Sequence, residues 1–278
     1  MIDREGALAL ASAPMKALAL ALASIALATA APALAQAPAS AEACFAHDAP
    51  QPDSVRAIRM TARDREGEKT VVVLRLYGRR SPEGLGRLFI RLEQPKEVSG
   101  TALLVLEQPH GASEIYLATP EMPTARRISG PTRADGMFRT DFSSEDLQRL
   151  QQGWRPGEGE LKLLPDGRVA ERPVYVAEVR PKQSSYERIL FSLDQESCLP
   201  LQVQFFDPGN ARPRKELTTD PRSNLKHGSL WVAHSALMRD LQNLTTTHLM
   251  VDSHEQEQLL PGGQFTVQAL EQAVREAK

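Results

Sequence analysis

The chain has 278 residues and a nearly balanced charge, with 33 lysines and arginines against 35 aspartates and glutamates and a formal net charge of −2. Proteins that bind nucleic acid through its phosphates need a surplus of basic side chains, so this balance argues against a nucleic-acid partner. The chain is long enough for one large β domain or two small ones.

The first 35 residues have the pattern of a signal peptide. Lys16 precedes an apolar, alanine-rich run that ends at Ala33-Leu34-Ala35, an A-x-A cleavage site. Acidic residues before Lys16 do not suit a signal peptide, so we expect translation to start at Met15. A transmembrane anchor is the alternative, but no basic stop-transfer flank follows the run. We therefore expect residues 1–35 to be removed, leaving a periplasmic protein that is soluble after cleavage.

The two cysteines, Cys44 and Cys198, fit an exported protein. In an oxidising compartment they are expected to form one disulfide, which in the chain-entropy model contributes about 4–5 kcal/mol for so long a loop. A redox-active pair is disfavoured because the chain has no C-x-x-C motif. A lipid anchor on Cys44 is also disfavoured, because the preceding Ala41-Glu42-Ala43 does not match a lipobox.

After the signal peptide, most of the chain has the two-residue period of β-strands. Residues 36–53 are rich in proline and alanine and are expected to be irregular. A charged turn with Gly67 joins the first two strands into a hairpin. The expected strands are Val55–Ala62, Lys69–Tyr77, Leu85–Glu93, Gly100–Gln108, Ser113–Ala118, Leu161–Leu164, Pro173–Arg180, Ser185–Asp194, Leu199–Asp207, Pro213–Thr219, Ser229–Met238 and Asn243–Val251.

Two short helices accompany these strands. Serine at 143 and 144 followed by Glu145 and Asp146 is typical of a helix start, and this helix is expected to run to about Gln152. A second helix, QALEQAVREA, is expected near the end of the chain. No internal repeat or long linker is visible. The pattern predicts a mainly β (α+β) domain over residues 54–278, built as a single curved antiparallel sheet or open barrel.

Three segments carry a resemblance to a known family. They read LFIRLEQPKEVSGTALLVLEQ, EIYLATPEMPTARRISGP and GMFRTDFSSEDLQ, between Leu88 and the helix that begins near Ser143. Together with Leu199-Pro200-Leu201 and Phe265-Thr266 in the C-terminal half, they resemble the LolA-like family of outer-membrane lipoprotein-sorting proteins. The chain departs from that pattern at Arg139, where the family has a small residue, and at Ser144, where it has tyrosine. It also leaves little room for the family's first amphipathic helix.

The resemblance implies an incomplete β-barrel, or half-barrel, with an apolar concave side covered by a few short helices. Several strands present a continuous apolar face of the kind such a cavity needs. The same pattern also fits an ordinary filled core, because strand periodicity does not distinguish a core from a cavity. The candidate cavity residues are Leu74, Leu76, Leu88, Ile90, Leu92, Phe191, Val203 and Phe205.

A lid is expected between the IYLATP strand and the first helix. Arg126 and Arg127 flank it, together with Arg133, and arginine suits phosphate head groups. The alternative, which we favour, is that these arginines pair with Asp141 or Asp146 and brace the lid. The lid and head-group candidates are therefore Arg126, Arg127 and Asp141.

Motifs for catalysis or metal binding are absent from the sequence. The chain has no nucleophile elbow, P-loop or dinucleotide fingerprint, and its six histidines are scattered. Asp252, His254 and Glu255 lie close together in sequence, but a polar turn explains them more simply than a metal site. We expect a protein that is not an enzyme and that has no cofactor and no metal.

Two functions follow from these expectations. The first is a periplasmic carrier that binds a lipid or lipoprotein acyl chain and moves it toward the outer membrane, receiving it from an inner-membrane transporter and giving it to an outer-membrane acceptor. The second is a periplasmic sensor or interaction protein on the same half-barrel fold, which regulates an envelope-stress or transporter partner.

Overall fold

The structure is a computed structural model that describes residues 40–46, 53–109, 113–129, 136–152, 159–228, 230–257 and 259–277. All of these lie in one compact unit, Ala35–Lys278. The expected signal peptide, its start at Met15 and Arg133 lie outside the described residues.

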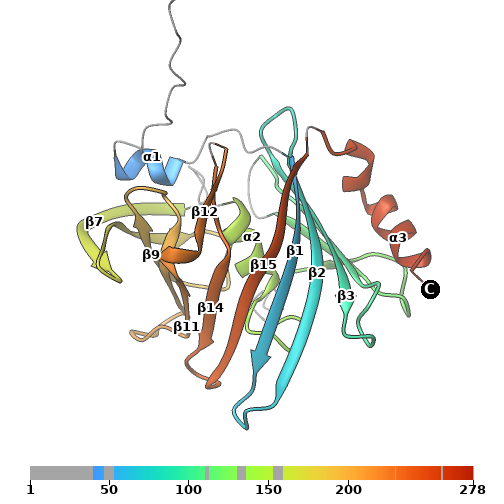
Figure 1. Cartoon of the computed structure of the whole chain (residues 1–278), viewed down its shortest axis with the longest axis horizontal. Helices are drawn as coiled ribbons and strands as arrows, with labels where there is room; N and C mark the ends of the chain where they lie inside the picture. Colours follow the sequence, from blue (N-terminus) through green and yellow to red (C-terminus); the bar gives the residue numbers. More distant parts are fainter. Residues whose placement is uncertain are drawn as a thin grey trace, which may run out of the picture. The chain divides into compact units, whose positions relative to one another are not determined.

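In the described part of the chain, thirteen antiparallel strands form one large sheet, ordered β6-β5-β4-β3-β2-β1-β15-β14-β11-β10-β9-β8-β7 (Figure 1). The chain builds outward to β6, restarts at the opposite edge with β7, and returns until β15 pairs with β1. The sheet is therefore curved but not closed, as the sequence predicted. Its strands are β1 (Asp53–Arg63), β2 (Lys69–Arg80), β3 (Gly86–Gln94), β4 (Ala102–Leu106), β5 (Glu114–Ala118), β6 (Arg126–Ile128), β7 (Gly159–Val169), β8 (Arg172–Pro181), β9 (Arg188–Asp194), β10 (Pro200–Phe206), β11 (Lys215–Thr219), β14 (Ser235–Asp240) and β15 (Thr245–Glu257).

Each predicted strand except Ser229–Met238 corresponds to one strand of this sheet. The predicted strand Ser229–Met238 is two strands, β13 (Leu230–Ala233) and β14, which are separated at His234. β13 pairs with β12 (Asn224–His227) in a small second sheet. Neither β12 nor β6 was predicted, because both are short and neither alternates between apolar and polar residues.

The sheet has a different apolar cluster on each face, because side chains alternate along a strand. Leu88, Ile90 and Leu92 of β3 belong to the largest buried cluster, on what we call the inner face. Phe89 belongs to another cluster, on the outer face.

Three α-helices among the described residues pack on these faces. The helix α2 (Ser144–Gln152) lies within the curve of the sheet, on the inner face, where the sequence predicted a helix (Figure 1). The helix α3 (Val267–Arg275) packs instead on the outer face, where its Leu270 and Val274 join the cluster of Phe89. The expected helical cover of the concave side therefore does not include α3.

The third helix, α1 (Ala41–Ala46), lies in the segment expected to be irregular. It contains Cys44, which forms the expected disulfide with Cys198. Phe45 beside it packs edge-to-face on Phe191, with ring centroids 6.1 Å apart. A helix this short is not stable alone even with good helix formers such as alanine and glutamate, so the disulfide and this aromatic contact help to hold it in place.

Candidate functional site

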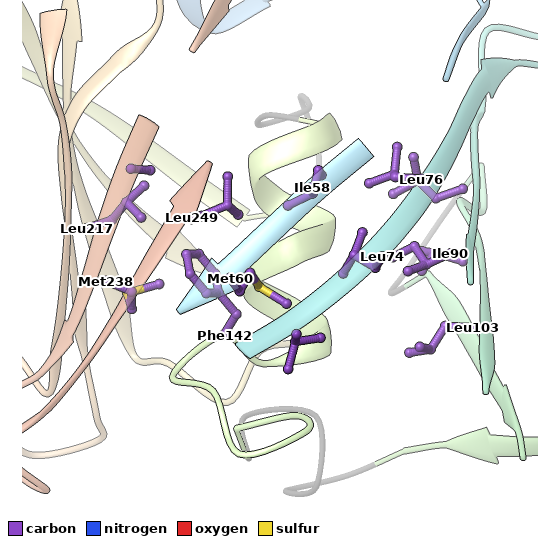
Figure 2. Close-up of a cluster of buried hydrophobic side chains, with 14 of the residues drawn as sticks. Ile58, Met60, Leu74, Leu76, Ile90, Leu103, Phe142, Leu217, Met238 and Leu249 are labelled. Atoms are coloured by element: carbon purple, nitrogen blue, oxygen red, sulfur yellow. The ribbon is translucent and has the colours of Figure 1, made fainter. Parts of the chain in front are cut away.

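The inner face brings all eight predicted cavity residues into one apolar cluster. Seven are buried in the core, and Phe191 at its edge is partly buried. Leu74 of β2 and Ile90 of β3, for example, lie side by side on neighbouring strands (Figure 2). Because these side chains have almost no accessible surface, the face is filled in this state. That they bind a ligand stays a prediction.

Part of the filling comes from a segment outside the sheet, Gly136–Gln152, which we call the plug. Its Phe142 has no exposed surface and packs in the inner-face cluster beside Met60 (Figure 2). Burying a phenylalanine side chain contributes about 1.5–3 kcal/mol. The plug therefore occupies apolar surface that would otherwise face solvent or a ligand.

A capping box starts α2 within the plug. The Ser143 hydroxyl accepts a hydrogen bond from the Asp146 amide at 3.1 Å, and the Asp146 carboxylate accepts one from the Ser143 amide at 2.9 Å. The serine and acidic pattern seen in the sequence therefore has the structural role expected for it.

Asp146 also holds the plug to the sheet. Its carboxylate accepts hydrogen bonds from the Tyr186 hydroxyl at 2.9 Å and from the Lys215 ammonium at 3.1 Å. Lys215 donates a further bond to the Asp141 carbonyl at 2.8 Å. Lys215 and Asp146 are 1% and 0% exposed, so this ion pair is fully desolvated. Burial, followed by the charge of Asp146, raises the pKa of Tyr186 well above its usual value, so the tyrosine remains a donor.

Two more carboxylates of the plug bind neighbouring elements. Asp141 accepts hydrogen bonds from the hydroxyls of Thr245 and Thr247 on β15. Glu145 accepts bonds from Arg149 and from Ser184 in the loop before β9. Burial raises the pKa of Glu145, but the charge of Arg149 and these bonds outweigh burial and lower it overall. Polar contacts thus anchor the plug on both sides of Phe142.

The turn before Phe142 has an unusual backbone. Phe138 and Arg139 have φ angles of 55° and 61°, the left-handed region that favours glycine. Each such residue costs about 1–2 kcal/mol relative to a right-handed conformation. Arg139 is the position where the resembled family has a small residue, so this chain keeps a conformation suited to glycine while carrying a long cationic side chain.

A pocket of about 380 Å³ opens beside this turn. The ends of β1 and β2, the β14–β15 turn and the plug form its walls. Its lining is polar and charged, and it contains none of the predicted cavity residues. The lining residues are Ala62, Arg63, Asp64, Glu68, Thr70, Gly136, Arg139, Thr140, Asp141, Arg214, Lys215, Asp240, Asn243 and Thr245.

The predicted pairing with Asp141 or Asp146 is not found for Arg127, and for Arg133, which lies outside the described residues, it stays a prediction. Arg126 and Arg127 lie on the edge strand β6, and Arg127 pairs with Glu114 of β5 at 3.2 Å. Lys215 takes the place predicted for an arginine beside Asp146. Glu114 lies on the preceding strand, which pairs with β6, whereas Lys215 comes from a strand distant in sequence, which motif order along the chain does not reveal.

A histidine cluster lies near the small second sheet. The Nε2 atoms of His227 and His234 are 3.0 Å apart, and the ring centroids of His227 and His254 are 4.7 Å apart. Burial lowers the pKa of His254 to about 4, and Arg56, His227 and His234 add to this shift. The histidines that appeared scattered in the sequence are therefore partly gathered by the pairing of β12 with β13 and by the contact of His234 with Val251 of β15.

Within the described ranges, no group of three or more histidine, cysteine, aspartate or glutamate side chains has an arrangement that would hold a metal ion. The same part of the chain contains no helix long and apolar enough to span a membrane.

Comparison with known proteins identifies the family and the fold. A family model with the description "Uncharacterized protein" matches residues 84–272, which is more than half of the chain. The chain belongs to this family. No curated protein matches the sequence. The family's matched region includes the plug and most strands of the large sheet.

Solved structures extend the comparison. A putative outer membrane lipoprotein-sorting protein domain from Vibrio parahaemolyticus is 23% identical, with a TM-score of 0.72 over 79% of this chain and 92% of that one. A DUF1329 family protein from Desulfovibrio piger is 20% identical, with a TM-score of 0.73 over 80% and 93%. A LolA superfamily protein from Nitrosomonas europaea is 15% identical, with a TM-score of 0.63 over 82% and 98%. At these identities the likeness shows the fold, which is LolA-like as the sequence motifs indicated.

Sequence reasoning missed the plug's anchor and the charged pocket. One signal for the anchor was present in the sequence. Lys215 lies two residues before the apolar Leu217, so both side chains are on the same, inward face of the strand. An inward lysine needs a buried partner, which strand alternation does not identify. The pocket had no comparable signal, because it combines turns and strand ends that are far apart in the sequence.

Proposed function

We propose that this protein is a non-enzymatic periplasmic carrier that binds the acyl chain of a lipid or lipoprotein on the inner face and moves it toward the outer membrane. The observation that carries the proposal is the pairing of a long apolar inner face with a plug that packs on it through the fully buried Phe142 and the partly buried Met137, Phe138 and Leu147. An acyl chain in water costs about 0.8 kcal/mol per CH₂ group, so shielding it requires apolar surface and no catalytic residue.

The plug explains how such a site would open and close. The plug's polar bonds are made by Asp141, Glu145 and Asp146, on either side of Phe142, while the contact of Phe142 itself with the inner face is apolar. An acyl chain replaces the apolar contacts of Phe142 with equivalent ones, so the two compete for the same surface. Binding and release then depend on the balance between plug-in and plug-out states.

Lipid extraction and mass spectrometry of the purified protein test this proposal, together with uptake of a fluorescent neutral acyl probe. We expect bound lipid in the wild type and tighter probe binding in Phe142→Ala, because the variant lacks the competing ring. Phe265→Ala is the matched control, since Phe265 is a buried phenylalanine of the outer-face cluster. It should lose stability without gaining probe affinity.

Two results would contradict the carrier. One is a protein without bound lipid that also takes up no probe in either form. The other is equal probe affinity in Phe142→Ala and Phe265→Ala, which would mean that any core cavity accepts the probe.

A further inference from the structure

We infer that the charged pocket beside the plug binds the phosphate head group of a lipid whose acyl chain lies on the inner face. This rests on the proposed carrier function and specifies the chemistry of its cargo. The pocket volume of about 380 Å³ falls within the range of about 300–1,000 Å³ that is usual for small-molecule sites.

The pocket lies next to the apolar cluster of the inner face. Ala62 and Thr70 pair across β1 and β2, and the next inward pair along the same strands is Met60 and Val72, both in the apolar cluster. On the other wall, Thr140 and Asp141 immediately precede Phe142. A head group in the pocket therefore directs its acyl chain along the surface that Phe142 covers.

Most carboxylates of the pocket already accept hydrogen bonds from neighbouring residues of the protein. Asp141 is held by two threonine hydroxyls, and Asp240 accepts bonds from the amides of Gln242 and Asn243 at 3.0 and 2.8 Å. Asp64 accepts a bond from the Glu68 amide at 2.7 Å. The Lys215 ammonium, although it lines the pocket, is likewise bound to the Asp141 carbonyl and to the plug.

The three arginines of the pocket make fewer and longer contacts with the rest of the protein. Arg214 lies 3.7 Å from Asp207 and 4.0 Å from Asp240, and its buried Nε has no hydrogen-bond partner among the described residues. Arg139 has only a 3.9 Å pairing with Glu68, in which both side chains are mostly exposed. The Arg63 guanidinium makes no side-chain hydrogen bond or ion pair within the described part of the chain.

The lining thus has equal numbers of basic and acidic residues. Its arginines, however, have more hydrogen-bond donors without a close acceptor than its carboxylates have acceptors without a donor. Guanidinium groups bind phosphate oxygens with paired hydrogen bonds, and several together suit a phosphate better than a neutral group. The left-handed backbone at Arg139 agrees with this assignment. Glycine would suit that conformation better than arginine, so the arginine is not explained by the backbone and its side chain is what the position contributes. Arg126 and Arg127, on β6, do not line this pocket.

Isothermal titration with three probes tests the head-group pocket: dioctanoyl phosphatidic acid, dioctanoylglycerol and glycerol 3-phosphate. We expect the wild type to prefer the phosphatidic acid over the neutral lipid by about tenfold, equivalent to about 1.4 kcal/mol. Arg139→Gly should abolish most of this preference while leaving neutral-lipid binding unchanged, and its folding should be unimpaired because glycine suits the backbone there. Arg63→Gln should reduce the preference in the same direction.

Arg126→Gly is the matched control, since it removes an exposed arginine outside the pocket and should keep the preference. If both lipids bind equally well to the wild type, or if Arg139→Gly keeps the preference, the head-group pocket is refuted while the carrier stands. If only glycerol 3-phosphate binds and Arg139→Gly abolishes it, the phosphate site stands, its source is a free phosphate ester, and the carrier is refuted. Binding of none of the three probes refutes both.

Discussion

The buried pair Asp146 and Lys215 offers the sharpest test of how the plug is held. Asp146→Asn removes the carboxylate charge and leaves the Lys215 ammonium, 1% exposed, without its counter-ion. Breaking one side of a buried ion pair costs about 3–5 kcal/mol, because a desolvated charge is left unpaired. Lys215→Met should cost a similar amount for the opposite reason. The double variant should cost less than the sum of the two, because it leaves neither charge behind.

Urea unfolding followed by circular dichroism measures these free energies, compared at equal slope. Glu93→Gln is the matched control: the Arg75–Glu93 pair has a similar separation of 3.0 Å, but its side chains are 44% and 39% exposed. Its loss should change stability by no more than about 1 kcal/mol. Costs below about 1 kcal/mol for Asp146→Asn, or strictly additive costs in the double variant, would refute the view that this pair anchors the plug.

Three further predictions concern stability. Replacing Cys44 and Cys198 by serine should lower the free energy of unfolding by about 2–4 kcal/mol, and a reductant should reproduce this in the wild type but not in the variant. Because burial first, and then Arg56, His227 and His234, lower the pKa of His254 to about 4, its contribution to stability is complete above about pH 6.5 and is lost as the pH falls toward 4. We expect about 1–2 kcal/mol, reduced by partial exposure, and His254→Gln should flatten this part of a pH series of urea unfolding curves; an unchanged pH dependence would exclude His254 as its source. Thr266→Ala should cost about 1 kcal/mol, because the Thr266 hydroxyl accepts a hydrogen bond from the Ala269 amide at the start of α3, whereas Thr266→Ser should be nearly neutral in thermal unfolding.

Local patterns in the sequence were enough to predict most of the sheet. Alternation along β3 placed Leu88, Ile90 and Leu92 on one face, and the structure confirms that they lie in one cluster. The Ser143 cap and the acids after it predicted α2. The disulfide was predicted from export and from a count of two cysteines. The strand and helix predictions depend on neighbours within a few residues. The disulfide prediction is simple because two cysteines can pair in only one way.

Features that depend on distant partners were predicted poorly. The arginines near 126 were expected beside Asp141 or Asp146, but Asp146 pairs with Lys215, from a strand that reaches it only because the sheet curves. The helix α1 is too short to be stable alone, so it depends on its contacts with Cys198 and Phe191. In both cases the stabilising contacts join residues that are far apart in the sequence, so no local pattern indicates that they meet.

The sequence by itself determined the class of this protein: a curved antiparallel sheet with an apolar inner face and motifs of the LolA-like kind. Strand period, caps and turns are local properties, so they can be read along the chain. Only the tertiary structure decided that Phe142 fills the inner face, that Lys215 anchors the plug, and that Arg63, Arg139 and Arg214 meet at one pocket. Strand alternation fixes only the side of the sheet on which each residue lies. Whether a side chain is buried, and whether its hydrogen-bond donors find acceptors, depends on which surfaces folding brings together.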